Sequence, residues 1–167
     1  MKQKKSTKIQ PRVSIICGSS SDYNLVRETE KILKKLKIKF DTRIVSAHRT
    51  PKRMFDWATN LHKKYTCCIA FAGGSASLPS VTAALSQGIP TIGVPVETSK
   101  LKGLDSILSM CMCPQGCPLA TMPIGKAGAI NAALFAAEII GTFDHKVKAN
   151  VLRWKSNQTQ SVKKRPR

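Results

Sequence analysis

The sequence predicts a three-layer α/β domain built around one parallel sheet. Short apolar runs rich in β-branched residues alternate five times with segments whose apolar residues recur at helical spacing. The chain has 167 residues, 42% of them hydrophobic, and is long enough for a single domain with its own core. In a parallel sheet the turns that follow the strands lie at one edge, which is where ligands bind.

The first strand is expected over residues 13–17 (Val-Ser-Ile-Ile-Cys), and residues 18–22 (Gly-Ser-Ser-Ser-Asp) follow it. A helix comes next, because residues suited to a core recur at helical spacing: Leu25, Val26, Thr29, Ile32, Leu33 and Leu36. The glycine and serines of this turn offer amides and hydroxyls to an anion in front of the helix N-terminus. Asp22 either caps the helix or accepts hydrogen bonds from ligand hydroxyls, such as those of a ribose.

The second strand is expected over residues 40–45, and residues 46–51 (Ser-Ala-His-Arg-Thr-Pro) follow it. Thr50 and Pro51 predict a helix over residues 50–64, with a capping hydroxyl followed by proline at the first helical position. In the turn itself, His48 can move a proton near neutral pH. Arg49 can hold an anion with its fork of donors.

The remaining strands are expected over residues 67–72, 91–94 and 119–122, and the remaining helices over residues 79–86, 104–110 and 127–140. Two glycines open the turn after the third strand (Gly-Gly-Ser-Ala-Ser-Leu-Pro) and allow a ligand to approach the backbone closely. The turns after the first three strands are therefore expected to line one pocket. An anion cradle, a titrating group and a glycine loop together favour an enzyme acting on a small phosphorylated substrate.

The net charge is +19, from 28 basic and 9 acidic residues. A nucleic-acid partner is one interpretation, but the basic residues gather in the two tails and at the end of the first helix. Aromatic residues make up only 5%, so no stacking platform for bases is visible. We expect no specific nucleic-acid partner. No apolar run is long enough to span a membrane, and no apolar signal core follows the basic N-terminus, so a cytoplasmic location is predicted.

Six cysteines are present, and three of them fall in one loop rich in methionine and proline: Cys111, Cys113 and Cys117. Their spacings, C-x-C and C-x-x-x-C, match no standard set of metal ligands, so no metal site is predicted. Cys17, Cys67 and Cys68 lie in apolar runs, where they are expected to be buried thiols.

Several motifs occur together in a characteristic order. Gly-Ser-x-Ser-Asp, Ser-Ala-His-Arg-Thr-Pro and Ala-Gly-Gly follow the first three strands, and Gly-Leu-Asp-Ser-Ile-Leu-Ser and Gly-Ala-Ile-Asn-Ala-Ala come later. From about residue 13 to residue 140 the chain closely resembles 5-(carboxyamino)imidazole ribonucleotide mutase, the class I PurE family of purine biosynthesis. This resemblance implies a flavodoxin-like fold, a homo-octamer, a nucleotide substrate and no cofactor. The chain is accordingly divided into a basic tail (1–12), which its polar composition predicts to be disordered, a PurE-like catalytic domain (13–144), and a C-terminal helix with a basic tail (145–167).

The resemblance also implies roles for individual residues. His48 would be the general acid and base, protonating the departing nitrogen and later removing the ring proton. Arg49, Ser19 and Ser21 would hold the 5'-phosphate, and Asp22 the ribose. The base and carboxylate would be positioned by the remaining residues of the predicted site: Ser46, Gly73, Gly74, Ser75, Ser77 and Leu78.

The chain departs from the family pattern at two places. Family members typically read Ala-Gly-Gly-Ala-Ala-His-Leu-Pro-Gly after the third strand, and Ser77 replaces that histidine here. Met112 occupies the position of a usual glutamine. A serine can bond to a carboxylate but does not titrate near neutral pH as imidazole does. Two alternatives therefore stay open: a divergent PurE paralogue that binds a small phosphorylated ligand with weak or altered activity, and a class II aminoimidazole ribonucleotide carboxylase. Arg49 argues against the second, since class II members normally have lysine there.

Overall fold

A five-stranded parallel sheet forms the centre of the molecule, in the order β2-β1-β3-β4-β5. The computed structural model describes residues 12–165. The strands are β1 (Arg12–Cys17), β2 (Lys39–Ile44), β3 (Cys67–Ala72), β4 (Thr91–Pro95) and β5 (Ala120–Thr121). The helices are α1 (Tyr23–Lys35), α2 (Pro51–Ala58), α3 (Ser77–Leu85), α4 (Leu104–Cys111), α5 (Gly125–Gly141) and α6 (His145–Ser161). Two short 3-10 helices are η1 (Ser20–Asp22) and η2 (Leu61–Lys63).

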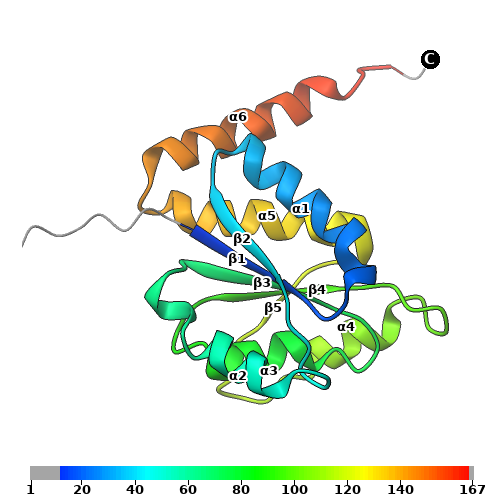
Figure 1. Cartoon of the computed structure of the whole chain (residues 1–167). Helices are drawn as coiled ribbons and strands as arrows, with labels where there is room; N and C mark the ends of the chain where they lie inside the picture. Colours follow the sequence, from blue (N-terminus) through cyan, green and yellow to red (C-terminus); the bar gives the residue numbers. More distant parts are fainter. Residues whose placement is uncertain (1–11, 166–167) are drawn as a thin grey trace, which may run out of the picture.

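Helices cover both faces of the sheet (Figure 1). On one face α1 and α5 pack together and α6 lies against α5, while α2, α3 and α4 lie on the other. Each face has its own apolar core, one around Val13, Phe71 and Val94 and the other around Ile16 and Met54. The predicted three-layer fold is thereby confirmed.

The sheet is most deeply buried at its centre. Every residue of β3 and β4 is buried, as expected for strands covered on both faces. The sequence Cys-Cys-Ile-Ala-Phe-Ala of β3 has no polar side chain to place in water, so this strand is central, between β1 and β4. β2 is an edge strand, and its residues are exposed or half-buried.

The third, fourth and fifth helices differ from their predicted bounds by at most two residues at each end, and the second helix differs by more. The helix expected over residues 50–64 ends at Ala58, and η2 follows it after a turn. Thr59 Oγ1 donates to the Phe55 carbonyl at 2.8 Å, and Asn60 Nδ2 donates to the Asp56 carbonyl at 2.8 Å. These side chains compete for helical carbonyls and favour a turn. α3 begins at Ser77, two residues earlier than predicted.

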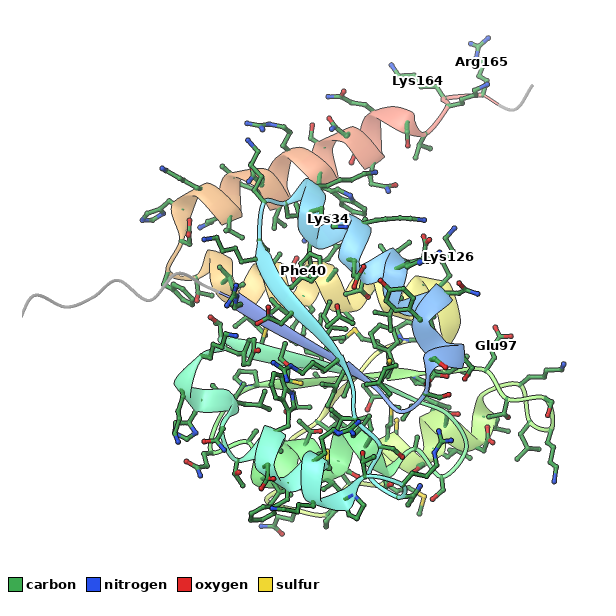
Figure 2. All side chains as sticks on the ribbon, in the orientation of Figure 1. Lys34, Phe40, Glu97, Lys126, Lys164 and Arg165 are labelled. Carbon is green, nitrogen blue, oxygen red and sulfur yellow. The ribbon has the colours of Figure 1, made fainter. Side chains whose placement is uncertain are left out.

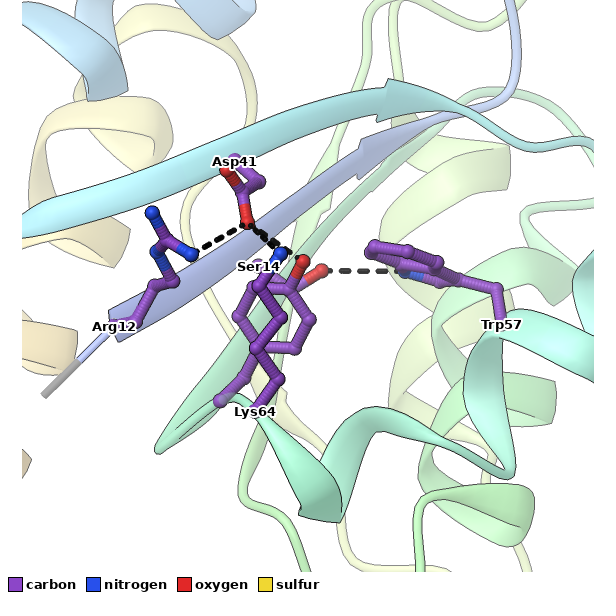
Figure 3. A network of polar contacts seen from close by, with 6 residues as sticks. Arg12, Ser14, Asp41, Trp57 and Lys64 are labelled. Carbon is purple, nitrogen blue, oxygen red and sulfur yellow. Dashed lines mark hydrogen bonds and ion pairs between the residues drawn. The ribbon is translucent and has the colours of Figure 1, made fainter. Parts of the chain in front are cut away.

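A polar network joins the amino-terminal part of the sheet to the segment between α2 and β3 (Figure 3). The Asp41 carboxylate accepts a hydrogen bond from the Tyr65 hydroxyl at 2.8 Å. The same carboxylate pairs with Lys64 at 3.0 Å and with Arg12 at 3.5 Å. Because all three partners reach Oδ2 of one aspartate, they tie β1, β2 and the start of β3 together.

The predicted N-terminal tail falls almost entirely outside the described residues, since residues 1–11 are not described, whereas the C-terminal segment is described as far as Arg165. Arg12, placed in the tail by the prediction, is the first residue of β1. The C-terminal helix is present as α6, and Asp144 caps it by accepting from the backbone N–H groups of Lys146 and Val147. Lys164 and Arg165 lie beyond the far end of α6 (Figure 2). Among residues 12–165, no helix has both the length and the apolar character needed to cross a membrane.

Candidate active site

A pocket of about 440 Å³ opens at the carboxyl edge of the sheet. Four loops line it, namely those that follow β1, β2, β3 and β4. The lining residues are Gly18, Ser19, Asp22, Ser46, Ala47, His48, Arg49, Ala72, Gly73, Ser75, Ala76, Ser77, Leu78, Val96, Glu97 and Thr98. The expected convergence of turns at one edge is therefore seen, with one loop more than the sequence predicted.

The loop after β1 is held by a capping box around η1. Ser21 N donates to Ser19 Oγ at 3.3 Å, and Ser19 N donates to Asp22 Oδ2 at 3.2 Å. The prediction that the Asp22 side chain caps α1 is wrong, because Asp22 stands at the N-cap of α1 but makes no side-chain cap hydrogen bond there. Its carboxylate instead completes the capping box of η1 and also lines the pocket. Burial raises the pKa of Asp22 above its usual value, although hydrogen bonds from Ser21 and Ser19 and the charge of Arg49 oppose the shift.

The loop after β2 is folded on itself through Ser46 and Thr50. Ser46 N donates to Thr50 Oγ1 at 2.9 Å, and Thr50 Oγ1 donates back to the Ser46 carbonyl at 3.0 Å. The prediction that the Thr50 hydroxyl caps α2 is wrong, because the side chain bonds to Ser46 and makes no cap hydrogen bond. Pro51 does occupy the start of α2, as predicted. The loop leaves His48 and Arg49 exposed at its tip.

Arg49 connects the first two loops. One guanidinium nitrogen, Nη2, donates to the Gly18 carbonyl at 3.3 Å, while Arg49 N donates to Ser46 Oγ at 3.1 Å. A second hollow of about 320 Å³ adjoins this side chain, and Arg49, Ser19 and Ser46 line both cavities. The remaining guanidinium donors can therefore serve an anion lying between the serines of the first loop and the second loop.

The glycine loop after β3 is held in place by a hydrogen bond to a side chain of α4. Gly74 adopts a left-handed conformation with φ of 67°, which favours glycine. Its N–H donates to Ser106 Oγ at 3.0 Å, and Ser106 Oγ donates to the Val96 carbonyl at 2.8 Å. The buried Ser106 hydroxyl therefore joins the loops after β3 and β4.

Ser77 and His48 meet across the pocket. Ser77 Oγ lies 3.0 Å from His48 Nε2, a hydrogen-bond distance whose direction depends on the histidine tautomer. Ser77 is the first residue of α3, and no side chain caps this helix. The residue that replaces the expected second histidine thus contacts the proposed acid and base directly.

Nine of the eleven predicted site residues line the pocket: Ser19, Asp22, Ser46, His48, Arg49, Gly73, Ser75, Ser77 and Leu78. Ser21 and Gly74 do not line it. Ser21 is exposed and donates from its Oγ to Asp22 Oδ1 at 3.3 Å, and Gly74 supports the loop through Ser106.

The sequence reasoning missed the loop after β4, which brings Val96, Glu97 and Thr98 to the pocket. The Glu97 side chain is exposed to solvent (Figure 2). Thr98 Oγ1 donates to the Asp105 carboxylate at 3.0 Å, which ties the loop to α4. The signal was present, because a Glu-Thr-Ser run after a strand resembles the polar turns that were recognised after the first three strands.

The cysteines are distributed as the sequence suggested. Cys17, Cys67 and Cys68 are buried, and burial raises the pKa of Cys17 to about 11. Cys111 is exposed, and Cys113 and Cys117 are half-buried. Within residues 12–165, no group of three or more His, Cys, Asp or Glu side chains is arranged to hold a metal ion.

Comparison with known proteins identifies the family. Residues 12–161 match the family model described as AIR carboxylase. The chain is 44% identical to the N5-carboxyaminoimidazole ribonucleotide mutase of Brucella melitensis over 155 residues, covering 92% of this chain and 95% of that protein. It is 43% identical to the enzyme of the same name from Bacillus subtilis, again over 92% of this chain and 95% of that protein.

The fold also matches a solved structure. The crystal structure of Treponema denticola PurE superimposes with a TM-score of 0.81 at 28% identity, covering 90% of this chain and 92% of that one. The family match and the identity to the curated mutases extend over nearly the whole described chain, including all four loops of the pocket. The chain therefore belongs to the AIR carboxylase family.

Proposed function

We propose that this chain is a mutase that converts 5-(carboxyamino)imidazole ribonucleotide to 4-carboxy-5-aminoimidazole ribonucleotide in purine biosynthesis. The observation that carries the proposal is the 44% identity to a mutase of that name, in a chain whose pocket brings His48 and Arg49 together. The reaction moves a carboxylate from the exocyclic nitrogen to the neighbouring ring carbon. It needs a proton carrier, an anchor for the nucleotide and a closed space for carbon dioxide.

His48 is the proposed proton carrier. Its imidazole lines the pocket and remains accessible to a ligand, and histidine exchanges protons near neutral pH. The imidazolium protonates the exocyclic nitrogen as the carbamate loses carbon dioxide. The ring carbon then attacks the trapped carbon dioxide, and the neutral imidazole removes the proton from that carbon. The histidine thus returns to its starting state after each turnover.

Arg49 and Ser19 are the proposed phosphate ligands. Both line the pocket and the adjoining hollow, and the guanidinium supplies charge-assisted donors. Ser21 contributes through the capping box that holds Ser19 in place. Asp22, which lies beside this anion site, is the proposed acceptor for the ribose hydroxyls.

The base and carboxylate are proposed to lie between Ser46 and the loop that runs from Gly73 to Leu78. The N-terminus of α3 begins at Ser77 in the pocket lining, has no side-chain cap and favours negative charge nearby. Gly73, Ser75 and Ser77 line the pocket on that side. The migrating carboxylate would therefore remain near positive helix dipole while it is detached from nitrogen.

A spectrophotometric assay with the purified protein tests this proposal. We expect conversion in both directions between the N-carboxylated and C-carboxylated nucleotides, without added ATP or metal. A control uses aminoimidazole ribonucleotide with bicarbonate. Faster carboxylation of that free nucleotide than isomerisation of its carbamate would support the class II carboxylase instead. Binding of the nucleotides without conversion would support the divergent paralogue, which the replacement of histidine by Ser77 makes worth testing.

We also propose that the protein is a homo-octamer. Four large apolar side chains on and next to α4 are exposed in the single chain: Leu101, Leu104, Leu108 and Met112. Exposed apolar groups close together favour burial against another protein surface. Light scattering after size-exclusion chromatography is expected to give eight times the 18.2 kDa chain mass, and a monomeric mass would contradict the proposal. The predicted cytoplasmic location stays a prediction.

A further inference from the structure

Ser77 is the residue at which this chain departs most clearly from its family pattern, and it is also the residue that touches His48. The 3.0 Å distance between Ser77 Oγ and His48 Nε2 joins the loop after β2 to the start of α3. A serine hydroxyl cannot titrate near neutral pH, but it has one proton to donate and lone pairs to accept another. A hydroxyl in that position can therefore pass a proton on without holding a charge.

We propose that Ser77 relays protons between His48 and the nucleotide. The inference rests on the proposed mutase function and assigns to Ser77 a step that His48 would otherwise perform directly. When His48 is protonated, its Nε2–H donates to Ser77 Oγ, which leaves the serine proton free to point into the pocket. When His48 is neutral with Nε2 unprotonated, the serine O–H donates to Nε2 instead. The hydroxyl reverses direction as the imidazole changes state.

Each transfer is balanced. In the first half-reaction the bond between nitrogen and the carboxyl carbon breaks, and its electron pair stays on nitrogen. Nitrogen takes the Ser77 proton while Ser77 Oγ takes the proton of His48 Nε2, and carbon dioxide is released. In the second half-reaction the ring carbon attacks carbon dioxide. The proton on that carbon then passes to Ser77 Oγ as the serine proton moves to Nε2.

The structure holds Ser77 in place better than it holds His48. The neighbours of Ser77 in the chain, Ala76 and Leu78, are buried at 2% and 3% exposure, and Ser80 Oγ donates to the Ser77 carbonyl at 2.9 Å. His48 is exposed at the tip of its loop. A fixed hydroxyl in front of a more accessible imidazole allows one proton carrier to serve two substrate atoms, the nitrogen that accepts a proton and the ring carbon that gives one up.

The contact itself is tested first, without substrate, by NMR of the imidazole nitrogens. The protein has three histidines, so His48 is easily resolved, and the exposed His62 and His145 serve as internal references. We expect Ser77→Ala to shift the His48 ring nitrogens and its tautomer ratio, while Ser77→Thr, which keeps the hydroxyl, moves them much less. Unchanged His48 signals in Ser77→Ala would overturn the proposal.

Kinetics then test the relay. We expect Ser77→Ala to lower kcat by about 100-fold, within the range of general acid–base effects, with a smaller change in KM. Ser77→Thr should recover activity to within about tenfold of the natural protein. Ser161→Ala removes a helical hydroxyl that donates to a backbone carbonyl in α6, outside the pocket, and we expect it to keep normal turnover.

The number of protons that move together in the reaction distinguishes a relay through Ser77 from a purely structural role of this residue. In mixtures of H₂O and D₂O, two protons moving together make the rate depend on deuterium fraction along a curve, and one proton gives a straight line. We expect a curve for the natural protein and a line for Ser77→Ala. A straight line for the natural protein, or a kcat for Ser77→Ala within twofold of normal, would overturn the relay while leaving the mutase function intact. An inactive natural protein whose His48 signals still respond to Ser77 would instead count against the mutase function, and the relay would fall with it.

Discussion

Two regions of this molecule gather charged and polar side chains, and they differ in how completely those groups are paired. Around Asp41, one carboxylate is met by Tyr65, Lys64 and Arg12, all supplied by the protein (Figure 3). At the carboxyl edge, Arg49 makes a single side-chain hydrogen bond, at 3.3 Å, among those found in residues 12–165. His48 meets only the Ser77 hydroxyl there. The first region uses its charges to join strands, whereas the second leaves donors available for a ligand.

The two aspartates carry opposite pKa shifts, and the difference follows from their partners. Burial raises the pKa of both, but for Asp41 the hydrogen bonds from Lys64 and Tyr65 and the positive charges nearby outweigh burial and lower it. For Asp22, burial dominates and the pKa is raised. The carboxylate that accepts from the uncharged groups of Ser19 and Ser21 is thus found at the pocket, while the one that pairs with Lys64 and Arg12 is found in the scaffold.

The largest expected effect is on the pocket side. His48→Asn should lower turnover by about 100- to 10,000-fold, because the general acid and base is lost. The melting temperature should stay close to that of the natural protein, since the side chain is exposed. His62→Asn, at an exposed position in η2, is the matched control and should keep full turnover. Normal turnover in His48→Asn would remove the basis of the proposed mechanism.

Arg49→Lys is expected to have the next largest effect. Lysine keeps the charge but loses the fork of donors, so nucleotide binding should weaken by about tenfold or more, measured by calorimetry with the product nucleotide. Lys52→Ala changes a neighbouring exposed cation that pairs with Asp56 outside the pocket, and it should bind normally. Equal losses in the two variants would indicate only a general effect of positive charge.

On the scaffold side, Asp41→Asn should lower the free energy of unfolding by about 1–3 kcal/mol at pH 7, because charged partners lose their acceptor. The lowered pKa means that the folded state prefers the ionised carboxylate. Its contribution is therefore present above the ordinary aspartate pKa of about 3.9 and is lost as pH falls through the folded value. Urea unfolding at pH 7 and in acid measures both effects. A variant as stable as the natural protein at pH 7 would show that the network contributes little.

The smallest effect is expected for Asp22→Asn. The raised pKa means that the folded state binds a proton more readily than the unfolded chain, so the ionised carboxylate costs stability above its folded pKa, and this cost disappears as pH falls. Asparagine keeps a capping oxygen, and the free energy of unfolding should change by less than about 0.5 kcal/mol at pH 7. Nucleotide binding should still weaken. A loss of stability as large as that of Asp41→Asn would remove the contrast between the two regions.

Much of the fold could be predicted because its signals are local. Apolar runs such as Cys-Cys-Ile-Ala-Phe-Ala identified the strands, and the polar turns after them indicated three of the four loops of the pocket. The bounds of α2 were harder to predict, since Thr59 and Asn60 end it through hydrogen bonds to backbone carbonyls. The loop after β4 carried a similar polar signal in its Glu-Thr-Ser run, but its place beside the other three loops follows from the strand order of the sheet.

The sequence by itself determined the three-layer fold, the family and the chemical groups of the site, because residue types and their spacing carry that information along the chain. Only the tertiary structure decided which groups meet. Ser77 and His48 are 29 residues apart, and Gly74 and Ser106 are 32 apart. These contacts arise because parallel strands bring the ends of distant segments to one edge of the sheet. The substitution that looked like the loss of a catalytic group in the sequence is, in the fold, a hydroxyl in contact with His48.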